Sequence, residues 1–388
     1  MKYKVAIYCP DQHLLYDLHT LDEKGVGGGV TARIRTAHAL AAAGHEVTAY
    51  VNCPKDETIE GVHYVHYSRV EKIQTDIFIA STSGGDLDLS SLREKDVAAR
   101  LRILMLHGKK LPNGTDPKSF DHVYALSNFI LDLATKNWGR EIFRFFVSHR
   151  GIAGDLYGSR DPGMRQRDLF AMVYAGHPSK GLDTAIEILR IVREHDPRFS
   201  LHIYGGYRLW GEDEQSIPNE PGVFYHGMLG QKDLAQRMQE CGYSLILQDL
   251  EEGFGMVVIE SMRAGCIVLA SAVGAYPELI RNGHNGFLVA GDHREKITRL
   301  DASQLILDLM SRPQYTAYIR RNAAAYPLDW SVIAQAWEGH WDWALSGKQP
   351  PPDQFGLGTC PSCGGSWLTL SDGFHCTECG RYARDLTP

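Results

Sequence analysis

Hydrophobic residues along this chain follow two alternating patterns. Short apolar runs of strand type are followed by longer segments whose apolar positions recur at helical spacing, which is typical of a parallel sheet wrapped by helices. In the first half, strands are predicted over residues 3–9, 46–52, 76–82 and 102–108, and a helix over residues 33–46.

The same alternation starts again in the second half. Strands are predicted over residues 169–177, 200–206, 223–227, 243–249 and 266–271, and helices over residues 181–195 and 255–265. Because 388 residues exceed one ordinary core, the two series predict two doubly wound, Rossmann-like α/β domains, residues 1–150 and 151–325. Ligands bind at the carboxyl ends of the strands in such sheets, so we expect a site where the two domains face each other.

The last sixty residues depart from this alternation. An apolar stripe at helical spacing is formed by Trp330, Ile333, Trp337, Trp341 and Ala344. It predicts a helix over residues 326–346 that packs back on the domains; acidic neighbours argue against the alternative, a helix lying on an anionic membrane. Residues 347–357, with three consecutive prolines, are predicted to be a linker, and residues 358–388 a small separate module.

The composition is that of a soluble globular protein. The chain has 44% hydrophobic residues, 22% charged residues and a formal net charge of -7, so a surface for nucleic acid or anionic lipid is not expected. No run approaches the roughly 18 apolar residues of a membrane span, and the apolar stretch at the amino terminus is too short for a signal peptide. The sequence therefore predicts a cytoplasmic protein, with peripheral attachment to the inner membrane left open.

The stretch "EGFGMVVIE" places Glu252 and Glu260 on either side of a glycine-bounded turn. It follows a predicted strand and opens a predicted helix, whose unpaired N–H groups and dipole favour a phosphate. Gly253 and Gly255 allow the backbone to approach such a ligand closely. Glu260 would then accept hydrogen bonds from a ribose, and Glu252 would face a sugar on the other side of the phosphate.

These residues resemble the retaining glycosyltransferases of family four, which are related to glycogen and sucrose synthases. Three further stretches carry the resemblance: "GGGVTARIRTAHALAAAGHEVTAYV", "AGHPSKGLDTAIEIL" and "GAYPELIRNGHNGFLV". Together they cover about residues 1–345. The resemblance implies the two-domain GT-B fold, a nucleotide diphosphate sugar as donor, and no catalytic metal.

The resemblance also implies roles for individual residues. Catalytic roles fall to Glu252 at the transferred sugar, Lys180 at the diphosphate and His107 beside the reacting sugar. The implied donor-binding residues are Gly28, Gly29, His177, Lys180, Phe254, Gly255, Met256, Val257 and Glu260. Two positions depart from the family pattern, because His177 stands where many members have arginine and Asp249 where serine is common. A neutral histidine is a weaker diphosphate ligand than arginine, so the donor is left open.

The implied reaction retains the anomeric configuration by same-face attack, with Lys180 and the helix amino terminus stabilising charge on the leaving diphosphate. Three alternatives are open: a glycoside hydrolase using the two glutamates as acid and base, a nucleotide-sugar epimerase, and an inactive protein that binds a sugar or a partner and acts through a zinc ribbon at its carboxyl end. The acceptor, whether glycan, lipid-linked glycan, protein or small molecule, cannot be read from the sequence.

The cysteines fall into two groups. Four are scattered in apolar contexts, which fits a reducing compartment, and four form two Cys-x-x-Cys pairs near the carboxyl end, each followed by glycine. The second group, Cys360, Cys363, Cys376 and Cys379, predicts a closed structural Zn²⁺ site in a zinc ribbon; iron or disulfides are the alternatives. The ribbon lacks the basic charge expected for nucleic acid, so docking of a protein partner, acceptor recognition and oligomerisation are left open.

Overall fold

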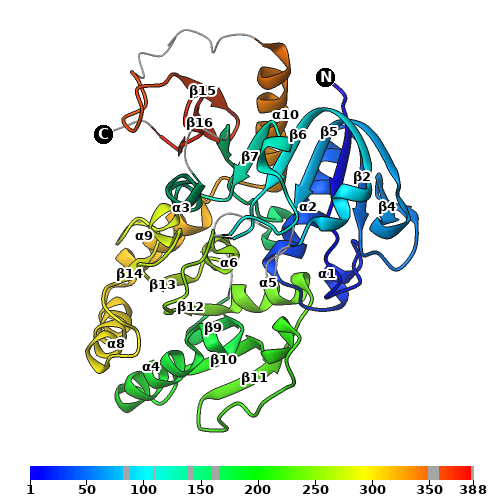
Figure 1. The fold of residues 1–388 in the computed structure, drawn as a ribbon. Helices are drawn as coiled ribbons and strands as arrows, with labels where there is room; N and C mark the ends of the chain where they lie inside the picture. The colour runs from blue at the N-terminus through cyan, green and yellow to red at the C-terminus, as the bar shows by residue number, and fades with distance from the viewer. Residues whose placement is uncertain (82–87, 109, 139–143, 159–165, 348–357, 386–388) are drawn as a thin grey trace. The chain divides into compact units, whose positions relative to one another are not determined.

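The computed structural model describes residues 1–388 apart from 82–87, 109, 139–143, 159–165, 348–357 and 386–388 (Figure 1). The chain forms two compact units. The first unit contains residues 1–18, 28–151 and 328–388, and the second contains residues 19–27 and 152–327. The predicted linker lies outside the described residues except for Gly347.

The first unit is built on an eight-stranded sheet with the order β3-β4-β2-β1-β5-β6-β7-β8. Its strands are β1 (Lys4–Tyr8), β2 (Glu46–Val51), β3 (Glu57–Ile59), β4 (Val62–His66), β5 (Lys72–Ser81), β6 (Asp96–Met105), β7 (His122–Ala125) and β8 (Phe145–Val147). All neighbouring strands are parallel except β3 and β4. The helices of this unit are α2 (Gly28–Ala42), α3 (Asn128–Trp138) and α10 (Trp330–Ser346).

Helix α10 carries the apolar stripe predicted from the sequence. Trp330, Ile333, Trp337 and Trp341 are each at most 5% exposed, because the helix packs against α2 and β6. The stripe therefore forms part of a protein core. Within the described part of the chain, the structure contains no helix that is both long enough and apolar enough to cross a membrane.

The second unit is built on a six-stranded parallel sheet with the order β11-β10-β9-β12-β13-β14. Its strands are β9 (Asp168–Gly176), β10 (Ser200–Gly205), β11 (Val223–Gly227), β12 (Cys241–Ile246), β13 (Ile267–Ser271) and β14 (Phe287–Val289). Its helices are α1 (Thr20–Glu23), α4 (Leu182–His195), α5 (Gln231–Glu240), α6 (Met256–Arg263), α7 (Tyr276–Leu279), α8 (Lys296–Met310) and α9 (Pro313–Ala324).

The order of the second sheet creates a switch point between β9 and β12. The chain runs outward from β9 to β10 and β11, and then returns to place β12 on the other side of β9. Strands β12 and β13 are buried at every residue, which is why they read as continuous apolar runs. The loops that follow β9 and β12 leave from neighbouring carboxyl ends, where open α/β sheets bind ligands.

The described carboxyl-terminal residues, 358–385, form a third, antiparallel sheet with the order β15-β16-β17, and we call this segment the ribbon. Its strands are β15 (Trp367–Leu370), β16 (Gly373–Cys376) and β17 (Tyr382–Ala383). The ribbon belongs to the first unit, and its strand β15 contacts helix α10 (Figure 1).

Several elements differ from the sequence-based expectation. Helix α2 starts at Gly28 rather than Arg33, because glycines are tolerated in the first turn, where N–H groups have no intrahelical partner. Strands β7, β8 and β14 have three or four residues, too few for a period to be read. Residues 19–27, expected in the first domain, belong to the second unit. Helix α1 packs closely on α5 there. A Cβ on Gly230, just before α5, would lie 2.0 Å from the Asp22 carbonyl oxygen.

Candidate functional site

The loop between β12 and α6 holds the first predicted carboxylate, Glu252. Phe254 anchors this loop, since its ring is 3% exposed. Gly255 precedes α6 with φ of 108°, and a Cβ there would lie 2.6 Å from the ring of Tyr276. The Glu252 carbonyl accepts a hydrogen bond from the Ala275 N–H at 3.0 Å, so a second loop braces the first. Helix α6 therefore begins on a rigid support with its first N–H groups available to a ligand.

Lys180 lies beside this loop and forms an ion pair with Glu252. Lys180 ends a short 3-10 turn, η7 (Pro178–Lys180), and the next residue, Gly181, has φ of 88°. A Cβ on Gly181 would lie 1.9 Å from the Leu247 carbonyl oxygen. Only glycine permits this approach of the loop after β9 to the end of β12. The switch point of the sheet thus brings together two residues that are 72 positions apart in the sequence.

His177 is buried under an aromatic side chain, Trp210, that was not selected from the sequence. The indole of Trp210 stacks on the imidazole with ring centroids 3.8 Å apart and planes 7° apart. The Ser179 N–H donates to His177 Nδ1 at 3.2 Å, so Nε2 carries the proton and faces Glu212 at 3.4 Å. The side chain of His177 is 3% exposed, and its Nε2 makes no hydrogen bond within the described part of the chain. Its predicted contact with the donor stays a prediction.

Trp210 closes the η8 turn (Tyr207–Trp210) that follows β10. It is 50% exposed, and the ammonium of Lys180 lies 5.7 Å from its ring centroid. This distance is within reach of a cation–π interaction. The signal that could have identified Trp210 is a lone tryptophan between two glycine-containing turns in an otherwise polar stretch, residues 205–215.

Tyr276 packs against the same loop and is hydrogen-bonded to Gln248. The amide of Gln248 donates to the Tyr276 hydroxyl, and the Gln248 N–H donates to Ser271 Oγ at 2.9 Å. Burial raises the pKa of Tyr276 well above its ordinary value, and the negative charge of Glu252 adds to the effect. Tyr276 therefore stays a neutral phenol, and it supports the loop by packing and hydrogen bonding.

The second predicted carboxylate, Glu260, lies in the second turn of α6 and is half-buried. Met256 and Val257 form the first turn of the same helix. Asp249, which departs from the family pattern, is exposed and pairs with Arg294 at 3.2 Å. Lys180, Glu252, Phe254 to Val257 and Glu260 thus belong to one unit.

The other predicted residues belong to the first unit. Gly28 and Gly29 open helix α2, and His107 follows strand β6. Arg150 lies against His107, with its Nη2 3.1 Å from the imidazole Nδ1. Burial lowers the pKa of His107 well below its ordinary value, and the charges of Arg150 and Arg33 add to the effect, so the ring is neutral. That these residues share one ligand with those of the second unit stays a prediction.

Arg150 is a buried cation that the sequence did not single out. It is 4% exposed, and within the described residues the structure gives it no carboxylate within ion-pair distance. Burial lowers its pKa to about 9, with a further contribution from the nearby charge of Arg33. Arg33 itself faces Asp11 at 3.8 Å and donates to the Tyr16 hydroxyl at 2.5 Å. A buried guanidinium with a neutral neighbour favours an anionic ligand.

The four predicted metal ligands of the ribbon converge. Their sulfur atoms all lie within 4.8 Å of one another, with Cys360 and Cys379 at 3.8 Å and Cys363 and Cys376 at 3.4 Å. A disulfide would require about 2.05 Å, whereas tetrahedral zinc at about 2.3 Å from each sulfur places neighbouring sulfurs about 3.8 Å apart. Backbone N–H groups of Gly365 and Cys379 point at cluster sulfurs at 3.4 and 3.5 Å. The cluster therefore fits a closed Zn²⁺ site.

Comparison with known proteins decides the fold. Residues 163–325 match the family model described as "Glycosyl transferases group 1". The solved structure of Anabaena HepE in complex with UDP-glucose matches 89% of this chain and 100% of its own, with a TM-score of 0.59 at 20% identity. This chain has the GT-B glycosyltransferase fold. The fold predicted from the sequence is thereby confirmed, and the group 1 match covers the part of this GT-B protein that holds Lys180, Glu252 and Glu260.

Curated relatives match parts of this GT-B chain. An uncharacterized glycosyltransferase of Methanocaldococcus jannaschii is 26% identical over 239 residues, which are 58% of this chain and 62% of that protein. The D-inositol 3-phosphate glycosyltransferase of Streptomyces coelicolor is 43% identical over 170 residues, 39% of this chain and 37% of that protein. The chain therefore spans less than two thirds of either relative.

Proposed function

We propose that this protein is a retaining glycosyltransferase that moves a sugar from a nucleotide diphosphate sugar to an acceptor. The observation that carries the proposal is the Lys180–Glu252 pair at the switch point, beside the first turn of α6. A sugar–phosphate bond has hydroxyls on one side and a dianion on the other. An adjacent carboxylate and ammonium complement these two sides.

In this proposal each group acts on one part of the donor. Lys180 and the first N–H groups of α6 stabilise the charge that develops on the diphosphate as the bond to the sugar breaks. Glu252 accepts hydrogen bonds from sugar hydroxyls, and Glu260 accepts them from the ribose. His107, held neutral, contacts the reacting sugar. Retention follows because the acceptor hydroxyl attacks the face that the diphosphate leaves, and an oxygen of the departing diphosphate takes the hydroxyl proton.

A panel of nucleoside diphosphates tests the donor site. We expect one of UDP, GDP, ADP and TDP to raise the melting temperature, because a ligand that binds the native state stabilises it. Glu260→Gln should reduce that shift and lower turnover, whereas Glu278→Gln, on α7, should leave both unchanged. With the matching nucleotide-sugar, the product's anomeric configuration should equal the donor's; inversion would contradict the retaining mechanism.

The product analysis also separates the alternative activities. Release of sugar from a simple glycoside without any nucleotide would support a hydrolase. Formation of a second nucleotide-sugar without an acceptor would support an epimerase. A protein that binds none of the four nucleotides would favour the inactive binding protein.

For the acceptor, the buried guanidinium of Arg150 favours a molecule with an anionic group. The Streptomyces relative is named for D-inositol 3-phosphate, a phosphorylated polyol. We expect transfer to inositol 3-phosphate to exceed transfer to inositol, and Arg150→Met to abolish the preference while Arg150→Lys keeps part of it. Equal rates for the two acceptors in the wild-type protein would contradict this assignment.

We also propose that the four ribbon cysteines bind one structural Zn²⁺. The support is the convergence of the four sulfurs at spacings that suit a tetrahedral site with no open position. Elemental analysis of protein purified without chelators should find about one zinc per chain. A Cys363→Ser variant should lose the metal, and an absence of zinc in the wild-type protein would contradict the assignment.

A further inference from the structure

Strand β8 is the last strand of the eight-stranded sheet, and the ribbon covers it. An edge strand exposes unpaired N–H and C=O groups that invite pairing with another chain. Here the Val147 N–H donates to the carbonyl of Gly380 in the ribbon at 3.0 Å. We infer that the binding partner of the ribbon is the chain's own first unit, and that the ribbon is a zinc-dependent clamp on strand β8 and helices α3 and α10.

Asn128, the first residue of α3, forms hydrogen bonds with the ribbon backbone. The amide nitrogen of Asn128 donates to the carbonyl of Tyr382 at 2.9 Å, and its amide oxygen accepts from the Tyr382 N–H at 3.0 Å. These two bonds satisfy both main-chain groups of one residue, as a neighbouring strand would. They fix a single position of the ribbon along α3 and do not depend on which side chain stands at 382.

The glycine after the last cysteine connects the metal site to the docking surface. Gly380 has φ of 72°, and its N–H donates to the Cys376 carbonyl at 2.9 Å, which closes the turn around the metal site. A Cβ on Gly380 would lie 2.1 Å from the Phe145 carbonyl oxygen of β8. The turn that positions Cys376 and Cys379 is therefore the same turn that contacts the edge strand.

A second connection runs through His375, which precedes Cys376. Its imidazole stacks on Phe146 of β8, with ring centroids 4.3 Å apart and planes 13° apart. Its Nε2 is hydrogen-bonded to Asp372 at 2.8 Å, and both side chains are at most 2% exposed. In the turn between β15 and β16, Ser371 Oγ donates to the Val332 carbonyl of α10 at 2.9 Å. The surface between the ribbon and the first unit is thus buried. Its polar contacts are hydrogen bonds to backbone groups, and they define one position of the ribbon.

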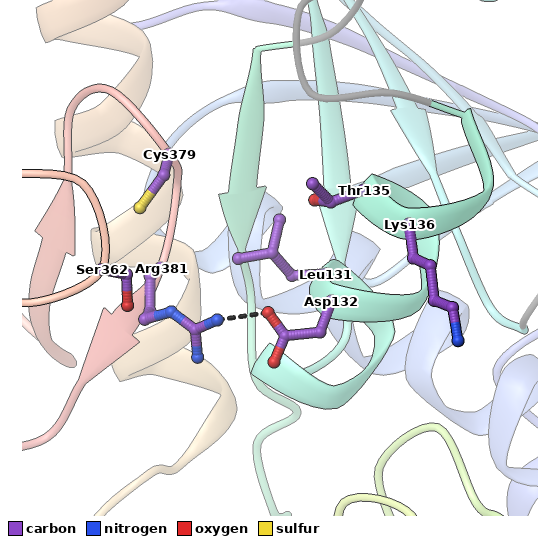
Figure 2. A pocket seen from close by; sticks show the side chains of 7 residues that line it. All are labelled: Leu131, Asp132, Thr135, Lys136, Ser362, Cys379 and Arg381. Carbon is purple, nitrogen blue, oxygen red and sulfur yellow. Dashed lines mark hydrogen bonds and ion pairs between the residues drawn. The ribbon is translucent and has the colours of Figure 1, made fainter.

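The rim of this interface is open. Figure 2 shows Arg381 of the ribbon paired with Asp132 on α3, at the side of a pocket of about 320 Å³ that Cys379 also lines. The carboxylate is 59% exposed, so this ion pair contributes little by itself. Among the described residues, the hydrogen bonds of Tyr382, Gly380 and Ser371 and the stacking on Phe146 hold the ribbon more firmly than this ion pair does.

Zinc is needed because the ribbon cannot order these contacts alone. Its own core consists of Cys360, Trp367, Cys376 and Cys379, with two partly buried neighbours. So small a core depends on metal binding for folding. A metal that binds only the folded ribbon also stabilises whatever the folded ribbon holds. Loss of zinc should therefore release β8 and α3 in the first unit, without affecting the second unit.

Hydrogen exchange on the full-length protein tests the clamp. We expect chelation with excess EDTA to accelerate amide exchange in residues 128–138 and 145–147 roughly tenfold or more, and added zinc to restore protection, while residues 241–263 stay unchanged. Asn128→Ala should produce the same release while zinc content stays near one per chain. Thr369→Ala, an exposed ribbon residue, is the matched control and should change neither.

Two results would overturn the inference. If chelation accelerates exchange only within the ribbon and leaves β8 and α3 protected, the ribbon is an independent module and its partner lies elsewhere. If Asn128→Ala leaves the exchange of β8 and α3 unchanged, the hydrogen bonds to Tyr382 do not hold the ribbon. Neither readout depends on transferase activity, so the clamp can fail while the proposed function stands, or the reverse.

Discussion

Replacing Lys180 by methionine tests whether this residue binds a diphosphate or only stabilises the fold. Methionine keeps much of the side-chain volume and removes the charge. Lys180 and Glu252 are each 28% exposed, so their mutual ion pair contributes only about 0.2–1 kcal/mol to stability. A charged hydrogen bond to a diphosphate is stronger, about 1.5–3 kcal/mol, which corresponds to a roughly 10- to 150-fold change in affinity. The variant should therefore lose far more affinity than stability.

The assay is isothermal titration with the nucleoside diphosphate that stabilises the wild-type protein, together with urea unfolding of both proteins. Lys232→Met is the matched control, because Lys232 is an exposed lysine on α5 of the same unit. We expect its affinity and stability to equal those of the wild-type protein. A Lys180→Met variant that binds the nucleotide with unchanged affinity would refute the reasoning, and so would one that loses several kcal/mol of stability at equal affinity.

Three further predictions concern other residues. Trp210→Ala should weaken diphosphate binding roughly two- to fivefold in titration, because the cation–π contact with Lys180 is lost, whereas Trp210→Phe should keep most of it. Gly181→Ala should lower the free energy of unfolding in urea by roughly 1–3 kcal/mol, since its φ is 88° and a Cβ would meet a carbonyl. Burial lowers the pKa of His122 from 6.5 to about 4, so between these values the unfolded chain binds a proton that the native chain does not. Stability is therefore full above pH 6.5 and falls below it, by about 2 kcal/mol at pH 5 in urea unfolding, and His122→Leu should flatten this dependence.

The sequence predicted the elements that have a long apolar run or a helical stripe. Strand β13, buried at every residue, and helix α10 with its tryptophans are examples. Strand β8 has three residues, and its position follows from pairing with β7 and from contacts with the ribbon. Short elements are specified by their neighbours in the sheet, so a local pattern cannot identify them.

The candidate site divides in the same way. Glu252, Gly255 and the start of α6 lie within one local stretch, whose turn chemistry is readable. Lys180 was linked to them only through the family resemblance, while the structure explains the link by the switch point of the sheet. Trp210 was missed because its role comes from the rings and charges that tertiary folding brings to it.

The docking of the ribbon illustrates why the remainder could not be predicted. The two Cys-x-x-Cys pairs predict a metal site because all four ligands lie within twenty residues of one another. Asn128 and Tyr382 are 254 positions apart, and neither residue type signals the contact. The sequence explains Gly380 by the turn of the metal site alone. Its close approach to Phe145 therefore could not be predicted from the sequence.

Gly181 and Gly380 stand directly after a residue with a chemical role, Lys180 in one case and Cys379 in the other. Each has a positive φ, and at each a Cβ would lie about 2 Å from a carbonyl oxygen of a distant strand or its continuation, Leu247 or Phe145. The functional side chain is thereby fixed against a sheet and not left on a mobile loop. Substituting either glycine should disturb its own turn and should also displace the side chain of the preceding residue, Lys180 or Cys379. A loss of diphosphate affinity in Gly181→Ala that exceeds the loss expected from partial unfolding would demonstrate this coupling, because the ammonium of Lys180 would no longer be held beside Glu252.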